Sequence, residues 1–420
     1  MLRRVQQAAA RHARARSSLN APGISGTLAV HGKEPLKKAT TPAKLALVVV
    51  TLGGLHLATA EPKVMLPPPE ETSRWSDAHP SPTEAKPRIL IVSDNLPSNV
   101  NGVVTFLRNM EAHARDAYDV VYMTPEQFPH VDCPGYPDIK LAVPFGFADK
   151  LAAAAPDFVH LATEGPLGLV ARLYCDAHGI AYNSAYHTRI PEYMQVTFGV
   201  PLAVGYSYLR WFHANSRQML TTTDTMVAEL RRRGFRPPIQ PMKFGVDRTV
   251  FRSDLRRRDR PSTGGPVLLS VGRVSKEKGL DAFCELNYPG ATKIVVGDGA
   301  YRRELEARYP EIQFVGVQTR VALAELYANA DCLVFTSRTD TFGLVMIESL
   351  ACGTPVAAFP VPGPIDAIEN GVTGYLSEDL KASVEACLAL DRRRVDEASH
   401  CWSWEHCWAT FQLHLIPSAA

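Results

Sequence analysis

From residue 88 onward, short apolar runs alternate with stretches of helical periodicity. The first run, Arg88–Ser93, precedes a helical stretch from Gly102 to Ala114. Further strands are predicted at residues 120–124, 157–161, 180–184, 267–271, 292–296, 312–315, 331–335 and 355–359. Because strands that alternate with helices pair in parallel, the pattern predicts an α/β protein with doubly wound parallel sheets.

The strand pattern restarts at Pro266, after a charged segment that is interrupted by glycine and proline. This segment, which begins at Arg252, is predicted to be a hinge. The expected organisation is therefore two Rossmann-like domains, 87–251 and 252–401, with a cleft between them. Ligands are expected at the carboxyl ends of the strands.

The last segment, 402–420, is predicted to contain one more helix. Ser403 is a suitable N-cap for a helix that extends to about Leu415. We expect the large aromatic residues of this segment to pack in a core rather than to bind a ligand. They are Trp402, Trp404, Trp408 and Phe411.

Residues 1–86 have a different character. Residues 1–33 contain five arginines and no acidic residue, as organellar targeting peptides do. Residues 45–60 form an apolar run that is shorter than the roughly 20 residues of a membrane span and resembles a signal h-region. The Pro-rich segment 61–87 is predicted to be a disordered linker. Two interpretations stay open: a targeting or anchor segment, or functionless residues added by an upstream start codon.

Charge and cysteine content narrow the class of protein. Residues 1–86 carry 12 basic and 6 acidic residues, so the remainder has a net charge of −4. A slightly acidic body argues against nucleic-acid binding, which needs a basic face. The eight cysteines form no Cys-x-x-Cys motif, which argues against structural zinc and favours reduced thiols. We therefore expect a reducing compartment, either the cytoplasm or an organelle stroma or matrix.

The most informative stretch is Asp340–Glu348, which places two carboxylates around a Phe342-Gly343 turn. A helix is predicted to begin at this turn and to end at Gly353. A helix N-terminus presents unpaired N–H groups and can hold an anion. Two carboxylates beside an anion site suit a ligand with many hydroxyls and a phosphate, such as a nucleotide sugar.

A complementary basic segment lies about seventy residues upstream. The predicted strand Val267–Val271 is followed by Arg273 and, five residues later, by Lys278. These two side chains are suited to converge on a diphosphate, one as a planar fork and one as a point charge. Either charged pair alone is weak as a signal. Their order, spacing and strand–turn–helix settings together are specific.

These motifs resemble the large retaining glycosyltransferase family 4, which has the GT-B fold, including its lipid-directed mannosyl and sulfoquinovosyl transferases. The family pattern is matched by Gly272, Arg273, Lys278, Gly279, Gly297-Asp298-Gly299, Asp340, Phe342, Gly343 and Glu348. The resemblance extends from about Arg88 to the C-terminus. It implies that the last helix crosses back to the N-terminal domain. One departure concerns the first acid, which is usually glutamate in the family and is Asp340 here.

The resemblance also implies roles for individual residues. The catalytic group is expected to be His187, Asp340, Arg273 and Lys278, and the donor-binding group Gly102, Val317, Phe342, Gly343, Leu344 and Glu348. Glu348 is expected to hold the ribose hydroxyls and Asp340 the sugar hydroxyls, while residues 316–318 take the base. Three residues that follow predicted strands are expected on the acceptor side: Glu164, Arg189 and Tyr193.

The expected activity is retaining transfer of a hexose from a UDP- or GDP-sugar to an acceptor hydroxyl, with a glycolipid precursor as the favoured acceptor. No Asp-x-Asp triplet occurs, so we expect a metal-independent hexosyltransferase without a cofactor. Two alternatives stay open. One is a non-catalytic protein that binds a nucleotide sugar or acts as a scaffold. The other is a different GT-B chemistry, such as an epimerase.

A helix predicted at 201–217 is rich in aromatic residues, and Arg210 adds a positive charge. The aromatic residues are Tyr206, Tyr208, Trp211 and Phe212. Such a helix can lie at a membrane interface, and peripheral membrane contact is therefore expected. The alternative, that these aromatics belong to the core, is equally consistent with the pattern.

Overall fold

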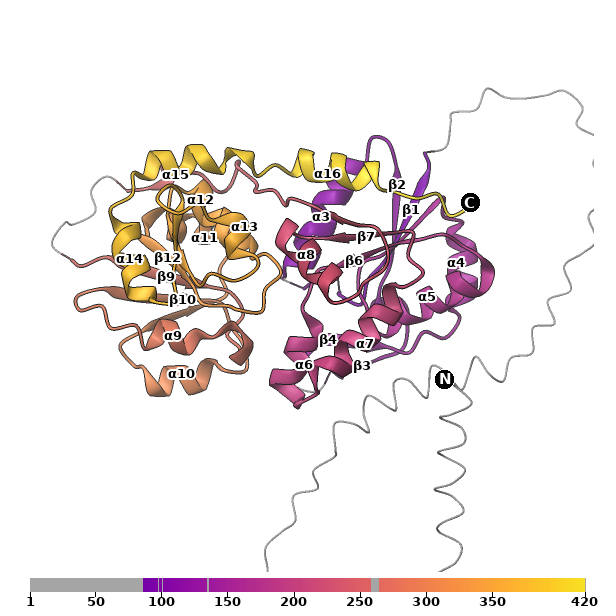
Figure 1. Ribbon diagram of the computed structural model, residues 1–420, viewed down its shortest axis with the longest axis horizontal. Coiled ribbons are helices and arrows are strands. Elements are labelled where there is room, and N and C mark those ends of the chain that lie inside the picture. The colour runs from indigo at the N-terminus through magenta and orange to yellow at the C-terminus, as the bar shows by residue number, and fades with distance from the viewer. Residues whose placement is uncertain (1–85, 97, 100, 134–135, 258–263, 420) are drawn as a thin grey trace, which may run out of the picture. The chain divides into compact units, whose positions relative to one another are not determined.

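The structure is a computed structural model that describes residues 86–419 except 97, 100, 134–135 and 258–263 (Figure 1). The predicted targeting or anchor segment and most of the predicted linker lie outside the described residues. In the part of the chain that is described, none of the helices combines the length and the apolar character that a membrane crossing requires.

The first sheet is parallel and is built from the N-terminal half of the described chain. Its six described strands run in the order β2-β1-β5-β6-β7-β8. Their bounds are β1 Arg88–Val92, β2 Asp119–Met123, β5 Phe158–Leu161, β6 Asn183–Tyr186, β7 Gln218–Thr221 and β8 Ile239–Pro241. The helices are α3 Gly102–Ala114, α4 Phe147–Ala154, α5 Pro166–His178, α6 Ile190–Phe198, α7 Leu202–His213 and α8 Asp224–Arg232. The strand order reverses between β1 and β5, and ligands bind beside such a reversal in open α/β sheets.

The second sheet repeats this plan. Its six described strands run in the order β11-β10-β9-β12-β13-β14. Their bounds are β9 Val267–Val271, β10 Thr292–Val296, β11 Gln313–Gly316, β12 Cys332–Phe335, β13 Val356–Ala358 and β14 Gly374–Leu376. The helices are α9 Leu280–Cys284, α10 Arg302–Arg308, α11 Arg320–Asn329, α12 Leu344–Ala351, α13 Pro364–Ala367, α14 Leu380–Leu388 and α15 Arg392–Ala398. Here the order reverses between β9 and β12, so the loops after these two strands meet at the ligand-binding edge.

The predicted fold class is confirmed, and the predicted strands are present with boundaries that differ by up to three residues. The sequence pattern missed β7, β8 and β14, which have only three or four residues each. It also missed an antiparallel pair, β3 His130–Cys133 and β4 Tyr136–Ala142. Strands of three or four residues offer few positions for an apolar run, and the longer β4 is interrupted by Pro137, Asp138 and Lys140.

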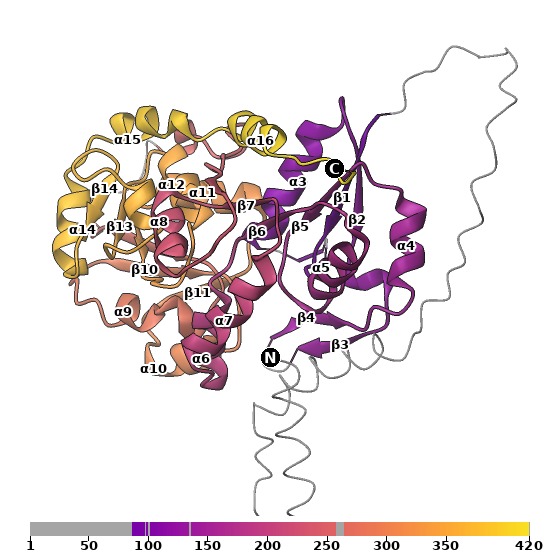
Figure 2. The same ribbon diagram turned by 45° about the vertical axis from the view of Figure 1, so that its right-hand side comes forward.

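The predicted last helix is α16, Trp404–Leu413, and Ser403 caps it by accepting a hydrogen bond from the His406 amide. Figures 1 and 2 both show α16 beside α3 of the first sheet's domain. Phe411 packs against Phe106 of α3, with ring centroids 6.1 Å apart. The expected core role of the aromatics is confirmed for the buried Trp402, Trp404 and Phe411, and Trp408 is partly buried.

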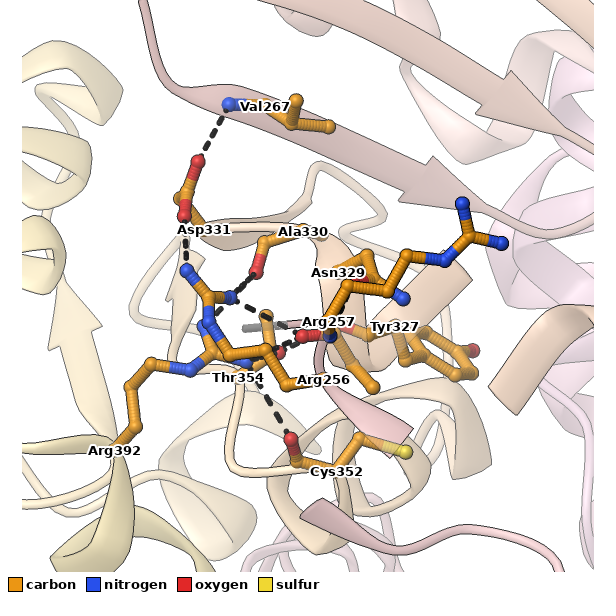
Figure 3. A network of polar contacts seen from close by, with 11 residues as sticks. Arg256, Arg257, Val267, Tyr327, Asn329, Ala330, Asp331, Cys352, Thr354 and Arg392 are labelled. Atoms are coloured by element: carbon orange, nitrogen blue, oxygen red, sulfur yellow. Dashed lines mark hydrogen bonds and ion pairs between the residues drawn. The ribbon is translucent and has the colours of Figure 1, made fainter. Parts of the chain in front are cut away.

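Two arginines fasten the ends of the second domain to helix α11 (Figure 3). Arg256, which follows the first domain, donates to the carbonyls of Ala328 and Ala330 at 3.1 Å each. Arg392, at the start of α15, donates to the same two carbonyls at 2.9 and 2.8 Å. A helix C-terminus leaves its last carbonyls without partners and favours positive charge. These contacts hold α11 in the position from which Tyr327 reaches the site.

Candidate functional site

Lys278 and Asp340 form an ion pair beside the strand-order reversal of the second sheet. Lys278 lies at the end of the turn that follows β9, and Asp340 lies in the loop that follows β12. The Lys278 ammonium donates a hydrogen bond to Asp340 Oδ1. Burial disfavours the charged ammonium, but the adjacent Asp340 carboxylate outweighs it and raises the pKa of Lys278 above its usual value. Two residues predicted to be catalytic are thus in direct contact.

Tyr193 reaches the same carboxylate from the first domain. This residue is part of α6, and its hydroxyl donates to Asp340 Oδ1 at 3.2 Å. Burial raises the pKa of Tyr193 to about 12, so the hydroxyl stays protonated and remains a donor. A residue predicted on the acceptor side therefore touches a residue predicted to hold the sugar.

Thr341 ties the same loop to the first domain by two further hydrogen bonds. Its hydroxyl donates to the carbonyl oxygen of His187 at 2.5 Å. Its own carbonyl accepts from the hydroxyl of Thr222 at 2.8 Å. The loop that carries Asp340 is thus tied to the first domain at two points.

His187 is 8% exposed, and its ring packs against Phe106 and Phe244 with centroids 4.8 and 6.2 Å apart. Within the described residues, neither ring nitrogen has a hydrogen-bond partner. Burial lowers the pKa of His187 to about 4, so the imidazole is neutral at physiological pH. A buried imidazole with both nitrogens available is unusual, because unpaired buried polar groups cost roughly 1–3 kcal/mol.

Arg273 precedes Lys278 in the same loop. Its guanidinium lies 4.0 Å from the Glu277 carboxylate, which itself accepts from the Ser275 hydroxyl at 2.6 Å. The Glu277 side chain is therefore buried and directed toward Arg273. The loop after β9 carries both predicted diphosphate cations.

The first turns of α3 and α12 approach one another. A Cβ atom added to Gly102, the first residue of α3, would lie 3.7 Å from Cδ1 of Leu344, the first residue of α12. Each helix start presents unpaired N–H groups and partial positive charge. Their approach suits an anion that lies between the two helix starts, as predicted for Gly102 and Leu344.

Phe342 and Gly343 shape the start of α12. Gly343 has a φ of 99°, and an added Cβ would lie 2.8 Å from the Phe335 ring, so glycine is required there. Phe342 is buried, and its ring packs against Phe244 of the first domain with centroids 5.5 Å apart. The turn therefore also contributes an apolar contact between the domains.

Glu348 lies one turn further along α12. Tyr327 of α11 donates its hydroxyl to Glu348 Oε2 at 3.1 Å. Burial raises the pKa of Glu348 to about 7, although the Tyr327 bond and the Arg320 charge act in the opposite direction. One carboxylate oxygen is thus already engaged, and the predicted ribose contact of this residue stays a prediction.

Val317 occupies an exposed turn between β11 and α11. Its side chain is 64% exposed, and the turn is closed by a hydrogen bond from Gln318 Nε2 to the Val315 carbonyl at 2.7 Å. An exposed apolar side chain beside a closed turn is compatible with a planar base stacked on it. The predicted role of the turn stays a prediction.

Glu164 has internal partners rather than a surface position. It is buried, and its Oε1 lies 3.3 Å from His213 Nε2. The other His213 nitrogen is 2.8 Å from the Ser184 hydroxyl. Burial raises the pKa of Glu164, and the His213 contact opposes that rise. The contact with His213 explains the buried position of Glu164 without a role in binding the acceptor substrate.

Arg189 is likewise directed inward. Its guanidinium donates to Glu229 Oε1 at 2.5 Å and lies 3.5 Å from Glu192 Oε1. Arg233 completes the group by pairing with Glu229 at 2.7 Å. Among the three predicted acceptor-side residues, the structure brings Tyr193 to Asp340 and gives Glu164 and Arg189 partners elsewhere.

The sequence analysis missed Asp94 and the threonines that hold the Asp340 loop. Asp94 follows β1 and accepts from the amides of Leu167 and Gly168 at 2.8 and 3.3 Å, which fills the N-terminus of α5. Its position directly after a strand was a usable signal. The roles of Thr222 and Thr341 have no local signal, because both depend on a distant partner.

Among the residues that the structure describes, no group of three or more His, Cys, Asp or Glu side chains could hold a metal ion. The predicted metal independence is a statement about catalysis and stays a prediction.

Comparison with known families assigns both halves of the chain. The family model described as Glycosyltransferase Family 4 matches residues 100–250. The model described as Glycosyl transferases group 1 matches residues 251–390. The two matches meet between residues 250 and 251.

Several curated proteins are similar to the chain. A GDP-mannose-dependent alpha-mannosyltransferase of Mycobacterium tuberculosis is 28% identical over 316 residues, which cover 69% of this chain and 83% of that protein. The sulfoquinovosyl transferase SQD2 of Arabidopsis thaliana is 27% identical over 274 residues, which cover 61% of this chain and 53% of that protein.

Solved structures share the fold. Sucrose-phosphate synthase from Thermosynechococcus elongatus superposes with a TM-score of 0.66 at 21% identity, covering 78% of this chain and 98% of that chain. Anabaena Alr3699/HepE, solved in complex with UDP and glucose, gives a TM-score of 0.59 at 19% identity, covering 78% of this chain and 99% of that chain. With the two family models spanning residues 100–390, the chain belongs to glycosyltransferase family 4, has the GT-B fold and is a glycosyltransferase.

Proposed function

We propose that the enzyme transfers a hexose from a UDP- or GDP-sugar to a hydroxyl of a lipid or glycan acceptor, with retention at the anomeric carbon and without a metal ion or other cofactor. The contact of Lys278 and Tyr193 with Asp340 carries the proposal. It combines a cation suited to a diphosphate with a carboxylate suited to sugar hydroxyls, at a point that both domains reach.

The leaving group is stabilised by fixed positive charge. Arg273, Lys278 and the N–H groups at the starts of α3 and α12 face the diphosphate as it departs. Preorganised charges of this kind perform the task for which other transferases use a divalent ion. Glu348 accepts hydrogen bonds from the ribose hydroxyls, and the turn at Val317 takes the base.

The transferred sugar lies between Asp340 and His187. Asp340 holds sugar hydroxyls, and its pairing with Lys278 makes it a poor nucleophile. His187 approaches the sugar as a neutral imidazole. The acceptor oxygen therefore forms its bond to the anomeric carbon on the same face from which the diphosphate departs. The departing diphosphate takes the proton of the acceptor hydroxyl, which balances the reaction.

The acceptor is a glycolipid precursor, such as a phosphoinositide or a diacylglycerol. Helix α7 buries Tyr206, Leu209 and Phe212 but leaves Val204 59% exposed and Trp211 44% exposed. The buried residues fit the core alternative for this helix. The exposed pair supports a peripheral contact with lipid, because apolar side chains on a surface helix can enter a membrane interface.

The catalytic domains operate in a reducing compartment. The structure describes the side chains of Cys175, Cys284, Cys332, Cys352, Cys387, Cys401 and Cys407; these seven thiols are free, and all of them except Cys401 are buried. Free buried thiols support a compartment in which disulfides do not form, the cytoplasm or an organelle stroma or matrix. Residues 1–86 act as a signal or an anchor for this membrane-associated enzyme.

The test is release of nucleoside diphosphate from GDP-mannose and from UDP-glucose, in excess chelator. Each donor is supplied with and without vesicles that contain phosphatidylinositol or diacylglycerol, and NMR gives the anomeric configuration of the product. We expect acceptor-dependent release with one donor, and a product that keeps the donor's configuration.

Other outcomes distinguish the alternatives. A scaffold would bind a donor without releasing nucleoside diphosphate. An epimerase would convert the donor sugar in the absence of an acceptor. Activity that is lost in chelator and restored by Mn²⁺ would contradict metal independence, and an inverted product would contradict retention.

A further inference from the structure

The carboxylate of Asp340 has two oxygens in different situations. Oδ1 accepts from both the Lys278 ammonium and the Tyr193 hydroxyl. No residue that the structure describes donates to Oδ2. Because a carboxylate can accept several hydrogen bonds, Oδ2 is the oxygen left for a ligand.

Tyr193 is held firmly behind this contact. On α6, Glu192 accepts from the Tyr206 hydroxyl of α7 at 2.6 Å. An added Cβ at Gly205 would lie 2.8 Å from Pro191 Cβ, so the backbone of α7 packs directly against the Pro191 side chain of α6. The Arg189–Glu229 ion pair fastens the start of the same helix. Tyr193 therefore presents its hydroxyl from a fixed position.

The length of the side chain at position 340 determines where its carboxylate lies relative to Tyr193 and Lys278. A glutamate would carry its carboxylate about 1.5 Å further from the backbone, the length of one C–C bond. With Tyr193 held in place and Lys278 bonded to the same oxygen, the longer side chain would lose one partner or force the other to move.

We propose that Tyr193 is a positioning residue for the transfer reaction. Its hydroxyl and Lys278 occupy Oδ1 of Asp340, which leaves Oδ2 to select the hydroxyls of the transferred sugar. Tyr193 and the short Asp340 side chain form a matched pair that determines sugar preference. This inference rests on the proposed function, because it assigns the sugar-facing part of that site.

A general tie between the domains is the competing explanation for the Tyr193 bond. Thr222 provides the control. Its hydroxyl also connects the first domain to the Asp340 loop, but it donates to the backbone carbonyl of Thr341 and not to the Asp340 carboxylate. Thr222→Val keeps the shape of the side chain and removes its hydroxyl. If the hydrogen bond only tied the domains together, Thr222→Val and Tyr193→Phe would change turnover alike. If Tyr193 positions Asp340, only Tyr193→Phe would change how turnover responds to Asp340→Glu.

The experiment is a double-mutant cycle of Tyr193→Phe with Asp340→Glu, with turnover measured on GDP-mannose and UDP-glucose. Residues in contact commonly couple strongly enough to change rates several-fold. We expect Asp340→Glu to lower kcat/KM about tenfold in the wild-type background and about twofold in the Tyr193→Phe background. The ratio of activities on the two donors should shift in the same variants. Affinity for GDP or UDP, which lack the sugar, should stay within about twofold by calorimetry.

The parallel cycle of Thr222→Val with Asp340→Glu should be additive. Additivity in the Tyr193 cycle, or equal coupling in both cycles, overturns the proposal. If the wild-type chain binds a nucleotide sugar but never turns it over, the proposed transfer fails instead. The Tyr193 cycle is then measured as the difference in affinity between nucleotide sugar and nucleoside diphosphate, where coupling supports the pair and additivity overturns it.

Discussion

The hydroxyl of Tyr327 donates to Glu348 Oε2 at 3.1 Å and so joins α11 to α12. Burial raises the pKa of this carboxyl to about 7, more than the hydrogen bond and the Arg320 charge lower it. Glu348 is consequently close to half protonated at neutral pH. Both the stability of the fold and the binding of a ribose should depend on that balance.

The first prediction concerns stability. The folded pKa of Glu348, about 7, lies above the unfolded value of about 4.3, so folding favours the protonated form. The stabilisation from this site is complete below about pH 4.3 and is lost as the pH rises through about 7. Glu348→Gln does not titrate and should therefore lose less stability than wild type between pH 5 and pH 8. Thermal unfolding at the two pH values measures this, and parallel losses would contradict it.

The second prediction separates the two acids. Glu348→Gln removes the charged acceptor of the ribose hydroxyls and should weaken nucleoside diphosphate binding by roughly 1–3 kcal/mol. Asp340→Asn should leave that affinity almost unchanged, because the product lacks the sugar, and should instead slow transfer. Calorimetry with GDP and UDP, beside transfer rates, provides the comparison. Equal weakening of product binding by both variants would show that the division of labour is wrong.

The third prediction concerns the diphosphate cations. Arg273→Ala or Lys278→Ala should lower kcat/KM at least about tenfold, since each charge-assisted hydrogen bond contributes about 1.5–3 kcal/mol. Lys276→Ala is the matched control. Its ammonium is in the same turn but lies over the Tyr301 ring, 5.2 Å from the centroid. Steady-state kinetics on the three variants decide the matter, and near-normal activity of both site variants would refute the assignment.

The fourth prediction concerns His187. Because burial lowers its pKa to about 4, this imidazole should stay neutral from pH 5 to pH 8. NMR of ring-labelled histidine should therefore show no titration of the His187 signal in that range, and His187→Ala identifies the signal. A transition near the ordinary value of about 6.5 would mean that the ring is solvated or paired with a carboxylate.

Much of the fold follows from local features of the sequence. The apolar run at Val267–Val271 is long enough to exclude a surface loop, and the helical period after it implies a parallel partner. The three-residue strands β8 and β14 lack such a signal, because their pairing is imposed by the neighbouring strands. The predicted bounds of β9 and β10 agree with the structure, and those of β6 differ most, by three residues at its start.

The sequence by itself determined which residues are predicted to form the donor site, because Arg273 and Lys278, and likewise Asp340 and Glu348, stand at motif spacings within one loop or one loop–helix unit. Only the tertiary structure decided their partners. Tyr193 and Asp340 are separated by 147 positions in the chain, yet share a hydrogen bond because the fold brings helix α6 of the first domain to the loop after β12 of the second. The inward turn of Arg189 was decided in the same way, by a buried Glu229 that neighbours it only in the folded protein. Spacing along the chain encodes contacts within one turn or helix, whereas contacts between domains depend on packing that no local pattern contains.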